Sequence, residues 1–215
     1  MSTRCVIIGG GGHARVVIDC LRVSGIAEPH AIVDAAPERR GSKVDGVEIV
    51  GGDDCLAGLL AAGVTHFVMG FAGAGNNAPR RRTFESVLAQ GFAPLKLVHP
   101  SAVVSAAATL ADGVQVLAQA VVGPGAELAM NVIVNTGAIV EHDCVVGPHA
   151  HIAPRACLAG GVRVEEAAHV GAGSVTRQLC VIGAGAIVGA GAAVIENVPA
   201  NVVVAGVPAT MLKPC

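Results

Sequence analysis

A histidine beside a carboxylate stands in the most polar stretch of the second half of the chain. Glu141, His142 and Asp143 follow one another there. A carboxylate next to an imidazole fixes its tautomer and raises its proton affinity, which is the minimum for a general base. A lone histidine in a turn is usually an ordinary polar residue, but His149 and His151 lie close by in the sequence. This stretch is therefore the first candidate for catalysis, with His142 as base and Asp143 as its partner.

A second candidate site lies near the N-terminus. Gly9, Gly11 and Ala14 match the dinucleotide fingerprint in its G-x-G-x-x-A form, and Asp34 ends a predicted second strand at about the right distance. Glycines let the backbone approach a phosphate, and the following helix supplies N–H donors. Asp34 can accept a hydrogen bond from a ribose hydroxyl or a base N–H. The motif also fits a tight turn without a ligand, and it does not separate NAD from a nucleotide-linked sugar.

A repeat of period six positions the catalytic candidates. From Val104 to Val194 an aliphatic residue stands at every sixth position, and only Thr176 departs from Val, Ile or Leu. A small or modest side chain precedes each of them by two residues, as Cys144 precedes Val146. This period predicts a parallel β-helix, in which each hexad forms one short strand plus a turn and three hexads close a coil. Turn-permissive residues directly after some of the aliphatic residues are expected to serve the turns: Gly123, Asn135, Gly147, Gly171, Gly183 and Gly189.

The register of the repeat places the two histidines on different edges of the prism. His142 follows the core residue Val140 and is expected at an exposed turn. His151 comes nine residues later, which is one and a half hexads, and His169 stacks one coil beyond His151. Joint action requires a neighbouring copy of the chain to bring its own edge across, so the register predicts an oligomer with sites between subunits. His149 and His169 are expected at the surface.

The first part of the chain alternates strands and helices, which predicts a small parallel α/β sheet of Rossmann-like type. Strands are expected at 4–8, 31–34, 47–50, 65–69 and 95–98, and helices at 14–23, 53–62 and 79–90. A sheet shorter than the six strands of a full dinucleotide fold favours a mononucleotide-type ligand. We expect two domains: residues 1–98 form the nucleotide-sugar-binding α/β domain, and residues 99–215 form the β-helix with a C-terminal tail.

Composition excludes several classes of protein. The 215 residues carry a formal net charge of −2 and no basic run, so nucleic-acid binding is not expected. Two uncharged stretches, 55–79 and 178–195, are interrupted by turns or follow the repeat, and neither is predicted to enter a membrane. The seven cysteines lack CxxC spacing, so we expect reduced thiols in a cytoplasmic protein and no metal site.

Four features together resemble the NeuD-like sialic-acid O-acetyltransferase family, which includes bacterial nucleotide-sugar N-acetyltransferases. They are Gly-Gly-Gly-Gly-His at 9–13, the hexapeptide repeat, the polar segment 135–143 and Val-Ala-Gly-Val-Pro-Ala at 204–209. The resemblance covers nearly the whole chain. It implies a left-handed parallel β-helix, a homotrimer, and acetyl-CoA bound between neighbouring β-helices without a metal.

The resemblance also assigns roles to residues. His142 corresponds to the catalytic base of the family, Asp143 to its acidic neighbour, and His151 to the histidine that contacts the thioester region. Ala172 and Ala190, eighteen residues apart in one column, correspond to backbone contacts with the pantetheine arm of acetyl-CoA. The nucleotide-sugar site corresponds to Gly11, Gly12, His13, Asp34 and Gly51. The residues that meet the coenzyme phosphates stay open among Arg155, Arg163, Arg177 and Lys213.

The expected function is acetyl-CoA-dependent N-acetylation of a nucleotide-linked 4-amino-4,6-dideoxy sugar, either GDP-perosamine or a UDP-linked 4-amino sugar. The sugar amine attacks the thioester directly, with His142 as general base. One alternative is O-acetylation of a sugar on the same scaffold, and another is a non-catalytic nucleotide-sugar-binding protein. A third, an NAD-dependent oxidoreductase, would need a substrate domain that the hexads do not resemble.

Overall fold

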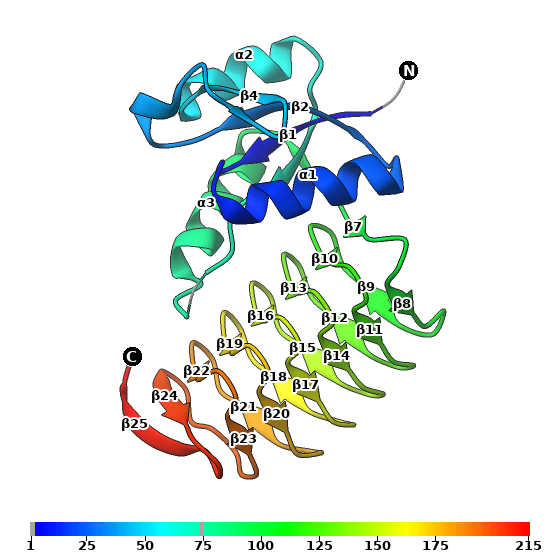
Figure 1. Ribbon diagram of the computed structural model, residues 1–215, viewed down its shortest axis with the longest axis vertical. Helices are drawn as coiled ribbons and strands as arrows, with labels where there is room; N and C mark the ends of the chain where they lie inside the picture. Colours follow the sequence, from blue (N-terminus) through cyan, green and yellow to red (C-terminus); the bar gives the residue numbers. More distant parts are fainter. Residues whose placement is uncertain (1–2, 74) are drawn as a thin grey trace.

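The chain forms an α/β layer stacked on a three-sided β-helix (Figure 1). The computed structural model describes residues 3–73 and 75–215. Six strands of the N-terminal part form one sheet in the order β3-β4-β2-β1-β5-β6. Their bounds are β1 (Arg4–Ile8), β2 (Glu28–Val33), β3 (Lys43–Val44), β4 (Val47–Gly51), β5 (His66–Met69) and β6 (Ala93–Pro94).

Helices cover both sides of this sheet. They are α1 (Gly12–Ser24), α2 (Leu56–Ala61) and α3 (Ala78–Ala89), with short 3₁₀ helices η1 (Pro37–Arg39) and η2 (Asp53–Cys55). The buried residues of α1 include Ala14, Val17, Ile18 and Leu21, which is the spacing of one helical face. The helix ends at Gly25, whose φ of 65° is the left-handed conformation that favours glycine. No helix in the described part of the chain is long and apolar enough for a membrane crossing.

The N-terminal sheet differs from the prediction in two respects. β3 pairs antiparallel with β4, so the sheet is mixed at one edge and reaches six strands, although β3 and β6 have only two residues each. The prediction that residues 95–98 close this sheet was wrong. β6 closes it instead, and β7 (Leu97–Val98) pairs with a strand of the β-helix. We propose that the two domains divide between β6 and β7.

The β-helix consists mostly of two-residue strands stacked in three parallel sheets, and it is left-handed as expected. The face below the α/β layer, here called the docked face, holds β7, β10 (Gln115–Val116), β13 (Ile133–Val134), β16 (His151–Ile152), β19 (His169–Val170), β22 (Ile187–Val188), β24 (Val202–Ala205) and, antiparallel at its end, β25 (Thr210–Pro214). The second, here called the bare face, holds β8 (Val103–Val104), β11 (Val121–Val122), β14 (Ile139–Val140), β17 (Cys157–Leu158), β20 (Val175–Thr176) and β23 (Ala193–Val194). The third face holds β9 (Thr109–Leu110), β12 (Glu127–Leu128), β15 (Val145–Val146), β18 (Arg163–Val164) and β21 (Val181–Ile182).

The predicted register is confirmed by the strand pairing and by burial. Residues eighteen apart pair in neighbouring coils, as Val140 does with Leu158. The hexad residues Val140, Val146 and Ile152 have no exposed surface, and Cys144 is fully buried. Burying such a branched side chain stabilises a fold by about 1.5–3 kcal/mol. Stacked aliphatic residues therefore supply the stability of this part without large aromatic rings.

The glycines after the aliphatic residues do not serve the turns in the predicted way. The residues with a left-handed backbone also recur every sixth position, but they stand two positions after these glycines would. Gly137, Asp143 and His149 are examples. Gly123 and Gly147 do not take up positive φ. A Cβ on either would lie under 3 Å from the backbone of the next coil. These glycines are needed for close approach between coils rather than for conformational freedom.

The α/β layer is fixed to the docked face by hydrogen bonds. The Oε1 of Gln115 accepts from His13 Nε2 at 2.9 Å, and its Nε2 donates to the Met69 carbonyl at 2.8 Å. Asn77, before α3, donates to the carbonyls of Ala167 and Ala168 at 3.2 and 3.1 Å. These contacts join both ends of the α/β layer to the coils.

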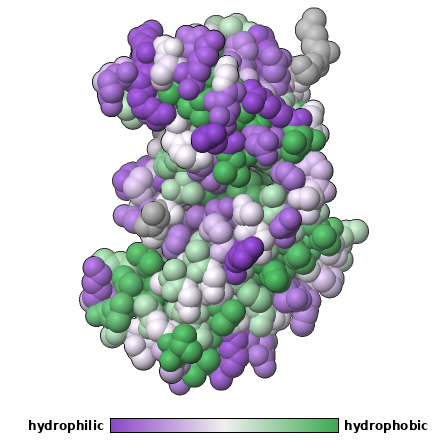
Figure 2. Space-filling view, viewed as in Figure 1, coloured by the Kyte–Doolittle hydropathy of each residue, from purple (hydrophilic) through white to green (hydrophobic). Residues whose placement is uncertain are grey.

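The bare face has an apolar outer surface. Its outward residues Val103 and Val175 are 64% and 51% exposed, and Leu179 at the next turn is 75% exposed. Figure 2 shows apolar residues gathered on the β-helix half, whereas hydrophilic residues dominate the upper half. Between Val103 and Val175 the same sheet presents Val121, Ile139 and Cys157, which are half-buried, so the outer surface of this face is an apolar strip along the prism.

Candidate active site

His142 and Asp143 lie at the turn between β14 and β15, on the edge where the bare and third faces meet. The Nδ1 of His142 is 2.9 Å from Asp143 Oδ2. Because the ionised carboxylate only accepts, Nδ1 carries the proton and Nε2 keeps a free lone pair. Asp143 adopts a left-handed φ of 58°, which Asp tolerates better than most residues. The turn geometry thus holds the carboxylate beside the imidazole.

The electrostatics of this turn favour a strong base. The hydrogen bond that His142 donates to Asp143 raises the pKa of His142 above its ordinary value of 6.5, and the charges of Asp143 and Glu141 act in the same direction. The imidazole lies against the next coil at Gly160. A Cβ on Gly160 would stand 2.5 Å from both Cε1 and Nε2 of His142. Only glycine leaves room for the ring in this orientation.

A shallow cavity surrounds the pair. It is lined by His142, Asp143, Ala159, Gly160, Gly161, Gln178 and Leu179. Its wall is formed mainly by small residues and by the exposed Leu179. The cavity therefore presents the basic nitrogen next to backbone and an apolar side chain, with space for a second molecule.

The predicted coenzyme residues meet in a separate groove, here called the acyl groove. It runs from His151 on the docked face to Ala172 and Ala190, which lie at the edge where the docked and bare faces meet, and Gly73 also lines it. The structure thus brings His151, Ala172 and Ala190 together around one groove. The acyl groove shares no lining residue with the cavity of His142. Within one chain, the base and the acyl groove lie on different edges.

The ring nitrogens of His151 are both engaged. Nδ1 is 3.1 Å from the Gly73 carbonyl and therefore carries the proton, and Asn135 donates to Nε2 at 3.0 Å. Burial, with the neighbouring His169 as a second cause, lowers the pKa of His151 to about 3. His151 is 4% exposed and packs edge-on against His169 at 4.9 Å between ring centroids. His151 is thus a neutral wall of the acyl groove.

The expectation that His149 lies at the surface was wrong, and His169 is half-buried rather than fully exposed. His149 is 6% exposed because its ring packs against Phe84 of α3, and Asn131 contacts its Nδ1 at 2.9 Å. His169 is covered by His151, and burial lowers its pKa. The α/β layer buries the docked face, and the repeat pattern alone contains no sign of that layer.

The glycine-rich loop opens into two cavities. Gly10 and Gly11 line both of them, and Gly12 lines the one that also contains Arg15 and Lys43. The other extends to Phe71 and Thr83. Gly11 precedes the first turn of α1, where free backbone N–H groups and the helix dipole favour an anion. The loop therefore has the form of a phosphate site.

Asp34 lines the cavity that extends to Phe71, where an ion pair with Arg39, which lines both cavities, holds it. Its Oδ2 accepts from the Gly10 backbone N–H at 2.7 Å and from Arg39 at 2.9 Å, and Oδ1 accepts from the Ala36 N–H at 3.0 Å. Arg39 also donates to the Gly10 carbonyl at 2.6 Å. Gly51 contacts Asp34 through its backbone carbonyl but lines neither cavity.

His13 points away from the glycine loop. Its ring contacts Gln115 of the β-helix, and burial lowers its pKa to about 4. It lines neither loop cavity. The structure therefore separates His13 from Gly11, Gly12 and Asp34, with which the sequence grouped it.

Comparison with known proteins assigns the family. The family described as the PglD N-terminal domain matches residues 4–87. A histidine-to-asparagine variant of perosamine N-acetyltransferase from Caulobacter crescentus, solved with CoA and GDP-perosamine, is 40% identical, with a TM-score of 0.92. The match covers 98% of this chain and 97% of that chain. The chain belongs to this family of nucleotide-sugar N-acetyltransferases. The predicted family is thereby confirmed.

Two further solved structures are similar to the chain over nearly its whole length. The acetyltransferase domain of PglB from Neisseria gonorrhoeae, solved with acetyl coenzyme A, is 35% identical with a TM-score of 0.89, covering 99% of this chain and 100% of that chain. WeeI from Acinetobacter baumannii, at 22% identity and a TM-score of 0.77, shares the fold over 97% of this chain and 99% of that chain. The chain is therefore an acyltransferase.

The sequence did not identify three residues that shape these N-acetyltransferase cavities. Arg39 closes the rim of the glycine loop, Gly160 makes room for His142, and Gln115 joins the loop helix to the β-helix. A signal existed for Gly160, because it lies eighteen residues after His142 in the same column. Arg39 and Gln115 depend on contacts that no periodicity expresses.

Proposed function

We propose that this chain transfers the acetyl group of acetyl-CoA to the amino group of a nucleotide-linked 4-amino-4,6-dideoxy sugar, with GDP-perosamine as the first candidate. The observation that carries the proposal is the similarity, over 98% of the chain, to a perosamine N-acetyltransferase solved with CoA and GDP-perosamine. The reaction requires a base for the attacking amine and a site for the nucleotide. The hydrogen-bonded His142–Asp143 pair is consistent with the first requirement and the glycine loop with the second.

His142 acts as the general base. The sugar amine attacks the thioester carbonyl, a C–N bond forms, and Nε2 of His142 takes a proton from the attacking nitrogen. The tetrahedral intermediate then collapses, the C–S bond breaks, and the imidazolium returns its proton to the departing CoA thiolate. Asp143 accepts from Nδ1–H throughout, so it stabilises the imidazolium and fixes the tautomer. No acyl-enzyme forms.

The nucleotide diphosphate binds at the glycine loop. Gly11 and Gly12 let its oxygens approach the first N–H groups of α1, and Arg15 and Lys43 line the same cavity and balance the negative charge. Asp34 and Arg39 at the rim offer an acceptor and a donor to the ribose and the base. Their present pairing must open for both groups to reach a ligand.

The site is completed between copies of the chain in a homotrimer. Two observations support this assembly. The cavity of His142 and the acyl groove share no residue within one chain. The bare face carries an exposed apolar strip, with Val103 and Val175 more than half exposed, which a neighbouring β-helix would cover. The acetyl group then lies between the acyl groove of one copy and His142 of the next.

The test is an acetyl-transfer assay with acetyl-CoA and paired amino and hydroxy sugars linked to GDP or UDP. Product mass and released thiol are both measured. We expect transfer to the amino sugar, and His142→Ala is expected to lower kcat roughly 10²- to 10⁴-fold with the fold retained, since the turn is exposed. Transfer only to the hydroxy sugar would replace N- by O-acetylation. An unchanged kcat in the variant would remove His142 as the base.

A further inference from the structure

Arg80 is a buried charged side chain that takes no direct part in the proposed acetyl transfer. It lies in the first turn of α3 and is 1% exposed. Burial lowers its pKa to about 9, so the guanidinium stays charged at neutral pH. It forms no salt bridge with any residue that the structure describes. Because a buried charge without a counter-charge destabilises a fold, stability does not account for Arg80.

The guanidinium of Arg80 is directed at one backbone carbonyl. Its Nη1 donates to the carbonyl of Phe71. Its Nε and Nη2 are buried and have no hydrogen-bond partner among residues 3–73 and 75–215. The nearby His13 offers no negative charge, because burial, with the charge of Arg80 as the second cause, lowers the pKa of His13 to about 4. The carbonyl of Phe71 is therefore the contact on which the charge of Arg80 acts.

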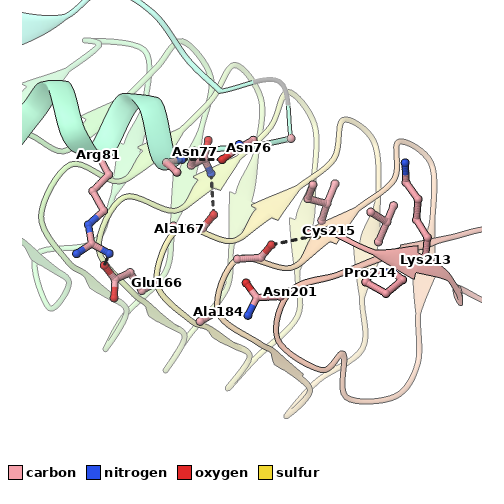
Figure 3. A pocket seen from close by; sticks show the side chains of 15 residues that line it. Asn76, Asn77, Arg81, Glu166, Ala167, Ala184, Asn201, Lys213, Pro214 and Cys215 are labelled. Atoms are coloured by element: carbon pink, nitrogen blue, oxygen red, sulfur yellow. Dashed lines mark hydrogen bonds and ion pairs between the residues drawn. The ribbon is translucent and has the colours of Figure 1, made fainter.

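Phe71 belongs to the segment that leads from β5 to α3, here called the linking segment (residues 70–73 and 75–77). At its beginning the Phe71 ring packs on the glycine loop, since a Cβ on Gly9 would stand 2.7 Å from the ring. At its end Asn77 donates to the Ala167 carbonyl of the β-helix at 3.2 Å (Figure 3). The linking segment therefore runs from the glycine loop to the docked face.

The linking segment lines the cavities proposed for both substrates. Phe71 lines a cavity of the glycine loop, where the nucleotide sugar is proposed to bind. Ala72, Gly73 and Gly75 line the acyl groove. The Gly73 carbonyl also accepts from His151 Nδ1 at 3.1 Å. A displacement of Phe71 would therefore alter the wall of one cavity directly and that of the other two residues further along the chain.

We propose that Arg80 is a positioning residue that fixes the linking segment and thereby sets the affinity for both substrates. The assignment rests on the proposed function, because it needs the nucleotide sugar and acetyl-CoA in these two cavities. Nη1 holds the Phe71 carbonyl, so the ring keeps its place in the glycine-loop cavity and Gly73 stays within reach of His151. Arg80 lines neither of these cavities nor that of His142, so it acts through the segment alone.

The test separates KM from kcat. Arg80→Met keeps an unbranched side chain and removes the charge and its donors. We expect the KM for acetyl-CoA and the KM for GDP-perosamine each to rise roughly tenfold, the scale of one charge-assisted hydrogen bond, while kcat stays within about twofold of wild type. A variant that only destabilises the chain lowers the active fraction instead, so its kcat falls while both KM values stay unchanged. Arg80→Lys keeps a charged donor and should bring both KM values back to within about threefold of wild type.

Arg82→Met is the matched control, because Arg82 is an exposed cation on the same helix and lines none of these cavities. The dissociation constants of CoA and GDP-perosamine, measured by calorimetry, give the same comparison without turnover, and both should rise in Arg80→Met. The assignment is overturned if only one substrate is affected, if kcat falls at unchanged KM, if Arg80→Lys behaves as Arg80→Met does, or if Arg82→Met has the same effect. A wild-type chain that binds both ligands but transfers no acetyl group would overturn the proposed function instead, and one that binds neither would overturn both.

Discussion

Acid should destabilise this fold through His151, which stays neutral between the two parts of the chain. Burial lowers its pKa from 6.5 to about 3. The unfolded chain therefore binds a proton at His151 below about pH 6.5, whereas the folded chain does not until about pH 3. The stabilisation is complete above pH 6.5 and is lost as the pH falls through this window.

The size of the loss follows from the pKa difference. Each pH unit below 6.5 lowers the free energy of unfolding by about 1.4 kcal/mol, so His151 alone accounts for about 2 kcal/mol between pH 7.5 and pH 5. His151→Asn removes the titrating ring, while its amide nitrogen lies near the place of Nδ1 and can still donate to the Gly73 carbonyl. Between pH 7.5 and pH 5, the free energy of unfolding of the variant should fall by about 2 kcal/mol less than that of wild type.

The measurement is urea unfolding at pH 7.5 and pH 5 with the protein concentration held fixed, because association changes apparent stability. His30→Asn is the matched control, since His30 is exposed on β2. Equal losses in wild type and His151→Asn would refute the reasoning. So would a control variant that flattens the pH dependence as much as His151→Asn does.

Three further changes test the candidate base and the register. Gly160→Ala places a Cβ 2.5 Å from His142 Nε2, and the displaced ring should lower kcat/KM roughly 100-fold without loss of thermal stability. In a His142→Ala background, the same change should not lower kcat/KM any further. Asp143→Asn removes the charge that helps raise the pKa of His142, so the acid limb of the kcat/KM profile should move to lower pH; an unmoved limb would argue against this pair. Val146→Asp buries a carboxylate, which should lower the free energy of unfolding by several kcal/mol. A variant that is still active and unfolds cooperatively on heating at the wild-type temperature would contradict the register.

The sequence predicted the β-helix because every coil repeats the same local constraint. Each hexad must bury one aliphatic side chain, so a period of six fixes the strand, the core position and the pairing partner eighteen residues away. The exposed turn of His142 follows from the position of Val140 alone. The column of Ala172 and Ala190 follows from the same register, and both residues line the acyl groove together with His151.

The docking of the α/β layer could not be predicted in this way. His13 and Gln115 are 102 residues apart, and His151 contacts Gly73 across 78 residues. No period relates such pairs, and the residues involved are ordinary polar types. The sequence therefore assigned His13 to the glycine loop by proximity along the chain, and it left His149 and His169 exposed because nothing indicated what covers them.

The separation of the two hollows has a geometric cause. A prism has three faces, and the α/β layer occupies one of them, together with the groove that runs beside it. His142 stands on the edge between the two remaining faces, which is opposite the docked face. No movement of a turn within one chain closes that distance, because the intervening coils are packed with fully buried aliphatic residues. Under the proposed function, His142 reaches a thioester on the docked face only if another copy of the chain supplies one of the two. The exposed apolar strip on the bare face lies beside the edge of His142, where that copy would pack.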